Sequence, residues 1–225
     1  MDSFIVASTG EWNLKYFNQF SKGQKGEWNY ASTTIELDKL LEVVNPQYIF
    51  FPHWSWLVPE EIVKRYECVC FHMTDLPYGR GGSPLQNLII QGFEKTMLTA
   101  LRMEKGVDTG PIYYKQPLSL RGSAHEIYCR ASALSWDMIA DFVKDRPSPM
   151  PQRGDVVNFK RRTPDLSLIP LGLSLEKVYD YIRMLDAPGY PKAFLETKEY
   201  RLEFDDAEYI GDKLSAKVSF IKQED

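Results

Sequence analysis

Cysteine is scarce in this chain, and its spacing is not that of a disulfide framework. Cys68, Cys70 and Cys129 are the only cysteines in 225 residues, an odd number without the regular spacing of small disulfide-stabilised domains. We therefore expect a protein of a reducing compartment. Cys68 and Cys70 are interpreted as small core residues rather than as metal ligands or a redox pair, and no metal site is expected.

Long apolar runs and an excess of basic residues are also missing. No run reaches the roughly 20 apolar residues that a membrane-spanning helix needs, and the N-terminus lacks the basic and then apolar segments of a signal peptide. The chain has 27 basic and 31 acidic residues, a net charge of −4. This balance argues against a strongly basic surface that binds nucleic acid. These absences predict a soluble, cytoplasmic protein that binds neither membrane nor nucleic acid.

Apolar runs of strand length alternate with helix-like patterns over the first 150 residues, and the hydrophobic content of 44% is enough for a core. This alternation predicts an α/β fold with a doubly wound, mostly parallel sheet over residues 1–150. Three prolines between residues 146 and 151 indicate its end. Residues 151–225 are expected to add a connector helix, capped by Ser174, and a C-terminal β-hairpin that turns near Gly211.

The polar segment of residues 21–32 contains two aromatic residues, Trp28 and Tyr30. It is long for a plain connection between elements. Its aromatic side chains can stack on a base or a sugar, or they can fold back onto the core, and the sequence favours neither interpretation.

The candidate catalytic residues lie between residues 70 and 110. A short apolar run delivers His72 to the end of a strand, and a loop of proline and glycine follows. A second apolar run, residues 97–103, leads to Asp108 in a turn that contains glycine. Because ligands of open α/β sheets bind just beyond strand ends, His72 and Asp108 form a candidate acid/base pair.

The residues of this stretch resemble the motif of the folate-dependent formyltransferases. The matching positions are Cys70, His72, Thr74, Leu76, Pro77, Tyr78, Gly79, Arg80, Gly81, Pro84 and 108–110. A later segment, residues 184–191, resembles the connector of the same family, so the resemblance covers most of residues 48–196. The chain departs from the pattern at Cys70, where the family has its catalytic asparagine.

The resemblance implies a Rossmann-like catalytic domain that uses 10-formyltetrahydrofolate as formyl donor. It implies that His72 donates to the developing oxyanion and shuttles a proton, while Asp108 orients His72 or a water. Backbone groups of Trp56, Leu57 and Val58 are expected to hold the pterin. Further contacts with the folate are expected from Gly82, Glu104, Gly106 and Val107.

The substitution at Cys70 removes a hydrogen-bond donor that the family has. Donors that can replace it are Thr74, Ser83, Gln86, Asn87 or a backbone N–H, and the sequence does not choose among them. Cys70 itself is not favoured as a nucleophile, because it lies in an expected buried strand without an evident activating base.

Members of this family formylate initiator methionyl-tRNA, glycinamide ribonucleotide or amino sugars on nucleotides. The acidic balance and the short segment after Pro191 favour a nucleotide-linked amino sugar as acceptor. The alternatives are a formyltransferase acting on methionyl-tRNA or another amine, a formyltetrahydrofolate hydrolase, and a non-catalytic folate- or sugar-binding module. We also expect a homodimer in which the apolar C-terminal strands contribute to the interface, unless the hairpin packs on its own domain.

Overall fold

The computed structural model describes residues 2–223, which form two compact units. Residues 2–81, 96–118 and 129–158 form the first unit, and residues 82–95, 119–128 and 159–223 form the second. This grouping does not test where an independently folding domain ends, so the boundary expected near residue 150 stays a prediction. Within residues 2–223, no helix has the length and apolar character that crossing a membrane requires.

A six-stranded sheet forms the centre of the first unit, with strand order β2-β1-β3-β4-β6-β7. β1 pairs in parallel with β2 and β3, and β3 pairs in parallel with β4, while β4 and β6 are antiparallel. The strands are β1 (Ser3–Ser8), β2 (Glu27–Ala31), β3 (Tyr48–His53), β4 (Glu67–His72), β6 (Lys95–Arg102) and β7 (Ile112–Ser119). The predicted α/β fold with a mostly parallel sheet is confirmed.

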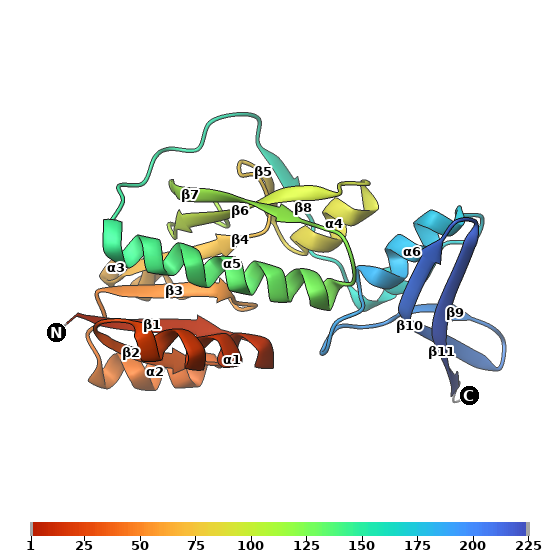
Figure 1. Ribbon diagram of the computed structural model, residues 1–225, viewed down its shortest axis with the longest axis horizontal. Helices are drawn as coiled ribbons and strands as arrows, with labels where there is room; N and C mark the ends of the chain where they lie inside the picture. The colour runs from red at the N-terminus through yellow and green to blue at the C-terminus, as the bar shows by residue number, and fades with distance from the viewer. Residues whose placement is uncertain (1, 224–225) are drawn as a thin grey trace. The chain divides into compact units, whose positions relative to one another are not determined.

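Helices cover both faces of this sheet (Figure 1). They are α1 (Glu11–Phe20), α2 (Thr34–Val43), α3 (Glu60–Arg65) and α5 (Ala124–Asp145). On one face, Ile49 and Phe51 of β3 share a buried cluster with Leu37 of α2 and Ile62 of α3. On the other face, the ring of Phe50 lies 5.4 Å from that of Phe142 of α5. Each large apolar side chain buried in this way contributes about 1.5–3 kcal/mol.

The prediction of a long loop over residues 21–32 is wrong. A single turn of 3₁₀ helix, η1 (Ser21–Gly23), leads into strand β2 at the edge of the sheet. The Trp28 ring lies 4.5 Å from Phe4 and 6.2 Å from Phe50, so it packs on the core. An edge strand has a partner on one side only, so polar residues alternate with its aromatics and hide its character in the sequence.

Two helices begin at capping boxes, α2 at Thr33 and α5 at Ser123. At the start of α2, Glu36 N donates to Thr33 Oγ1 at 3.2 Å, and the Glu36 carboxylate accepts from the backbone N–H of Ser32. At the start of α5, Glu126 N donates to Ser123 Oγ, and Ser123 N donates to the Glu126 carboxylate. Each pair satisfies backbone N–H groups that have no partner within the helix.

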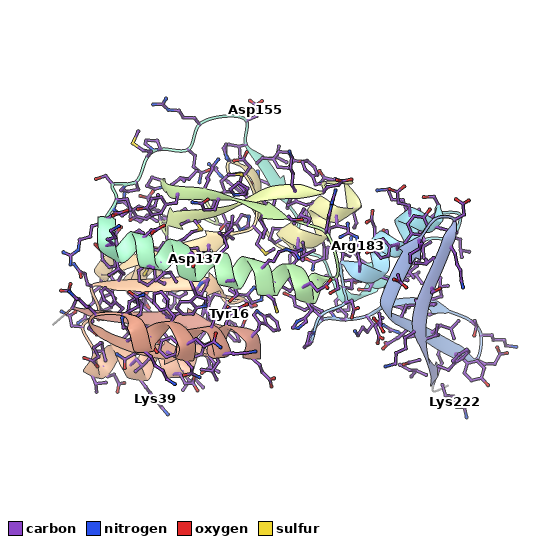
Figure 2. The ribbon with its side chains drawn as sticks, in the orientation of Figure 1. Tyr16, Lys39, Asp137, Asp155, Arg183 and Lys222 are labelled. Carbon is purple, nitrogen blue, oxygen red and sulfur yellow. The ribbon has the colours of Figure 1, made fainter. Side chains whose placement is uncertain are left out.

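The second unit contains α4 (Pro84–Ile90), α6 (Leu175–Arg183), the 3₁₀ turn η2 (Pro164–Ser167) and an antiparallel sheet in the order β11-β10-β9. The sheet strands are β9 (Ala193–Glu196), β10 (Tyr200–Ile210) and β11 (Lys213–Lys222). The predicted hairpin is present, and β9 adds a third strand to it. Arg183, labelled in Figure 2, donates to the carbonyl oxygens of Leu120 and Gly122 and to the carboxylate of Asp180, which fastens α6 within its unit.

Candidate active site

His72 and Asp108 lie side by side in the first unit. His72 is the last residue of β4, and its side chain is almost fully buried. Its Nδ1 lies 3.5 Å from Asp108 Oδ2. Asp108 has a φ of 54°, a left-handed conformation that aspartate tolerates better than most residues. The turn between β6 and β7 thereby brings the carboxylate to the end of β4.

The other ring nitrogen of His72 also faces an oxygen. Nε2 lies 2.8 Å from the carbonyl oxygen of Gly79. A neutral imidazole has a proton on only one nitrogen, whereas the protonated ring can donate to both oxygens. When His72 takes up a proton, each of its two N–H groups therefore faces an oxygen acceptor, Asp108 Oδ2 or Gly79 O.

A backbone N–H and a side-chain amide hold the Asp108 turn in place. Gly81 N donates to Asp108 Oδ2 at 2.9 Å, and Gln152 Nε2 donates to Asp108 O and to Gly110 O, each at 2.8 Å. A Cβ atom on Gly110 would lie 1.8 Å from the carbonyl oxygen of Arg102, so only glycine fits this close approach. The carboxylate is thus fixed from β5 (Tyr78–Gly81), the short strand after β4, and from a segment far along the chain.

Cys70 lies two residues before His72 in β4, so the two side chains point to the same face of the sheet. Burial raises the pKa of the Cys70 thiol well above its ordinary value, and the charge of Asp108 acts in the same direction. The thiol therefore stays protonated at neutral pH and is a poor nucleophile. Of the residues singled out as donors, Thr74 shares an acceptor with His72, because its Oγ1 donates to the same Gly79 oxygen at 3.4 Å.

The donors predicted in and around α4 are engaged within the second unit. Asn87 Nδ2 has two protons and three carbonyl acceptors, those of Gly82, Ser83 and Lys160. Gln86 Nε2 donates to Tyr128 Oη and Met184 O, each at 3.0 Å. Ser83 Oγ accepts from Arg162 N. Asn87 thus has no amide proton to spare for an oxyanion, and its side chain fixes the start of α4 instead.

The residues expected to contact folate expose apolar surface and backbone. Trp56 is 46% exposed, Leu57 84% and Val107 54%, whereas Val58 packs against the core. Trp54, whose ring lies 4.8 Å from that of Trp56, has a buried indole N–H without an acceptor among residues 2–223. Flat apolar walls beside an unused donor fit a pterin, which has aromatic faces and polar edges.

The other predicted folate contacts lie in two places. Glu104 and Gly106 are exposed in the turn after β6. Glu104 also forms part of the wall of a cleft of about 400 Å³ between that turn and α3, to which Lys64 and Arg102 contribute charge. Gly82 belongs to the second unit, where a Cβ on it would lie 2.5 Å from Cβ of Arg161. Packing alone therefore requires a glycine at position 82, independently of any contact with folate.

Sequence reasoning missed Arg80, Gly81 and Gln152 as supports of the pair. Gly81 belongs to a visible cluster of glycines, but nothing in the sequence indicates that its N–H would meet Asp108. Gln152 is a single glutamine in a proline-rich segment and gives no signal at all.

Comparison with known proteins places this geometry in a family. Residues 19–127 match the family model described as "Formyl transferase", and residues 164–221 match "Methionyl-tRNA formyltransferase, C-terminal domain". A solved structure titled methionyl-tRNA formyltransferase from Clostridium thermocellum is 45% identical, with a TM-score of 0.96. The alignment covers 99% of this chain and 100% of that one. The chain belongs to the folate-dependent formyltransferase family.

More distant similarities of this formyltransferase are of two kinds, one in sequence and one in fold. The methionyl-tRNA formyltransferase of Rickettsia massiliae is 28% identical over 191 residues, which cover 81% of this chain and 63% of that protein. The chain thus spans about 63% of the length of this curated relative. A 4-N formyltransferase from Francisella tularensis, with a TM-score of 0.69 and 14% identity over 99% of this chain and 97% of that one, shares the fold.

These names correct the expected partners of the formyltransferase. The prediction of a nucleotide-linked amino sugar, and of no nucleic acid, is contradicted by relatives named for methionyl-tRNA. The prediction relied on the short segment after Pro191 and on net charge, and net charge is an average over the whole chain. Contact with phosphates depends on local charge instead, and Arg153, Lys160 and Arg161 are all exposed within one short segment.

Proposed function

We propose that this formyltransferase transfers the formyl group of 10-formyltetrahydrofolate to the α-amine of methionyl-tRNA. The main support is the similarity over the full chain, at 45% identity, to a protein titled methionyl-tRNA formyltransferase. The match of residues 164–221 to the C-terminal domain of such enzymes supports the same acceptor. The juxtaposition of His72 and Asp108 supports the chemistry.

The reaction exchanges one amide bond for another. The amine nitrogen bonds to the formyl carbon and loses a proton, the bond between that carbon and N10 of the folate breaks, and N10 takes up a proton. The formyl oxygen gains negative charge on the way. 10-Formyltetrahydrofolate supplies the formyl group, and the residues of the chain orient it, stabilise the charge and move the proton.

His72 and Asp108 are proposed to carry the proton. His72 has its Nδ1 beside the Asp108 carboxylate and its Nε2 beside Gly79 O, so uptake of a proton gives an imidazolium with an acceptor on each side. His72 can donate to the formyl oxygen when that oxygen replaces Gly79 O as the acceptor of the Nε2 proton, and a donor aimed at such an oxygen is commonly worth about 3 kcal/mol. Asp108 fixes the ring and stabilises its charge.

The loop after β3 and the turn after β6 are proposed to bind the folate. Trp56, Leu57 and Val107 offer apolar surface to the ring system, and the indole N–H of Trp54 offers a donor to a polar edge. Cys70 takes the position of the asparagine in the family pattern as a neutral thiol beside the pair.

The test is formylation by the purified chain with 10-formyltetrahydrofolate and one of four acceptors: initiator methionyl-tRNA, elongator methionyl-tRNA, free methionine or a nucleotide-linked amino sugar. Mass spectrometry of the aminoacyl group or the sugar detects the formyl gain, and formate release is followed in parallel. We expect formylation of methionyl-tRNA that Asp108→Asn abolishes. Release of formate alone, formylation of the sugar alone, or folate binding without turnover would contradict the proposal.

A further inference from the structure

We propose that Gln152 is a positioning residue that holds the Asp108 carboxylate against His72. Gln152 lies in the irregular segment between α5 and β8 (Val157–Phe159), far in the sequence from both residues. Its side-chain hydrogen bonds go to Asp108, Gly110 and Arg80 and not to His72, so its proposed effect on the reaction is indirect and passes through the turn that holds Asp108. This inference rests on the proposed function for its link to catalysis, and on the geometry alone for the positioning.

The donor side of Gln152 is fully used by the Asp108 turn. Its Nε2 has two protons, and the carbonyl oxygens of Asp108 and Gly110 each lie 2.8 Å away. These carbonyls flank Thr109, so one side chain fixes both ends of the turn. Asp108 has a φ of 54° in this turn. A conformation of this kind is strained for a residue other than glycine and persists when surrounding contacts hold it.

The acceptor side of Gln152 is joined to β5, the short strand that bonds the carboxylate. Its Oε1 accepts from Arg80 Nε at 3.1 Å and from Arg80 Nη2 at 2.8 Å. The next residue, Gly81, donates its N–H to Asp108 Oδ2 at 2.9 Å. The result is a closed ring of contacts from Asp108 O through Gln152, Arg80 and Gly81 back to the Asp108 carboxylate. Both the backbone and the side chain of Asp108 are therefore held by one connected set of groups.

Gln152 is itself anchored close by. Two residues earlier, Met150 forms a two-way backbone bridge with Ile112 of β7, at 2.7 and 2.8 Å. Pro149 and Pro151 on either side restrict the backbone of this segment. A glutamine placed there supplies a donor group and an acceptor group in one rigid amide. Glutamate has no proton for the two carbonyls, and methionine has neither function.

The test compares Gln152→Met, Gln152→Glu and Arg80→Met with a matched control, Gln116→Met, which removes an exposed glutamine of β7. Steady-state kinetics with 10-formyltetrahydrofolate and methionyl-tRNA give kcat and KM, and NMR hydrogen exchange reports the Gly81 amide. For Gln152→Met we expect kcat to fall at least about tenfold with KM for the donor nearly unchanged, because a small displacement of a reacting group is costly. We also expect faster exchange at Gly81 and little change in Tm.

Gln152→Glu and Arg80→Met separate the donor side of the Gln152 amide from its acceptor side. Gln152→Glu keeps the acceptor for Arg80 but loses the donors to the turn, so it should lower kcat as Gln152→Met does. Arg80→Met keeps the donors and should have a smaller effect. Unchanged Gly81 exchange in Gln152→Met overturns the positioning role even if the wild-type chain formylates no tRNA, and wild-type kcat in that variant overturns the link to catalysis.

Discussion

The carbonyl oxygen of Gly79 lies 2.8 Å from Nε2 of His72, on the ring nitrogen that does not face Asp108. Gly79 has a φ of 77°, which a glycine adopts without strain and which turns its carbonyl back toward the end of β4. The short strand β5 after β4 therefore supplies one of the two oxygens around the imidazole, and Asp108 supplies the other. This environment is the basis of the first prediction.

Replacement of His72 by Ala, or of Asp108 by Asn, should reduce kcat for formyl transfer by about 100-fold or more, because each removes a member of the proton-carrying pair. Circular dichroism should show an unchanged fold. His125→Gln, a substitution of a histidine that lies in the second unit, serves as the control and should keep wild-type kcat. Full activity in either pair variant would contradict the assignment.

Cys70→Ala should retain kcat within a few-fold of wild type. Burial and the charge of Asp108 raise the pKa of the thiol, so the reaction does not use a thiolate nucleophile. For the same reason, iodoacetamide at pH 8 should modify Cys70 slowly and inactivate the protein little. A loss in Cys70→Ala as large as that in His72→Ala, or rapid inactivation that Cys70→Ala prevents, would show that the thiol takes part. Cys129→Ala controls for the other partly exposed cysteine.

The free energy of unfolding should decrease as the pH falls from about 6.5 to about 4. Burial lowers the pKa of His53 from 6.5 to about 4, so the fold favours the neutral ring. The neutral His53 ring adds to the free energy of unfolding, and this contribution is fully present above the pKa of 6.5 in the unfolded chain. It is lost as the pH falls toward the folded pKa of about 4, because in this range the unfolded chain binds the proton and the folded chain does not. One such group changes stability by up to about 1.4 kcal/mol per pH unit. Urea unfolding of wild type and His53→Gln across this range isolates the effect, because other groups titrate in both. Equal slopes would contradict it.

Gly110→Ala should destabilise the chain by about 2 kcal/mol or more, because the new Cβ would lie 1.8 Å from the carbonyl oxygen of Arg102 and the backbone must shift. Gly23→Ala is the matched control, since a Cβ there would meet nothing within 4 Å. Thermal unfolding of the two variants measures the difference. Equal Tm values would mean that the close approach at Gly110 relaxes without cost.

The sequence predicts the central geometry because that information is local. His72 ends an apolar run, Asp108 lies in a glycine-containing turn, and each capping box sits within four residues. Gln152 is different, since its partners lie 44 and 72 residues away and a glutamine has no characteristic pattern around it. Strand β2 was missed because an edge strand needs apolar residues on little of its surface.

The acceptor was predicted wrongly for a related reason. Net charge sums Arg153, Lys160 and Arg161 with all the acidic residues of the chain, and the sum does not show that the three fall within one short stretch of sequence. Only a structure shows that the amide of Asn87 already faces three carbonyl oxygens, because two of its acceptors are local and the third, Lys160 O, lies 73 residues away.

The left-handed backbone of Asp108 also bears on how genes for such chains change over time. Asparagine and glycine are the residues that adopt this conformation most readily, and each is one base change from an aspartate codon. Either replacement keeps the turn but deletes the negative charge. These two base changes would therefore give well-folded chains without the carboxylate, and such chains would escape quality control in the cell and persist at normal abundance. Genomes that carry extra copies of this gene are where inactive versions of this kind should accumulate.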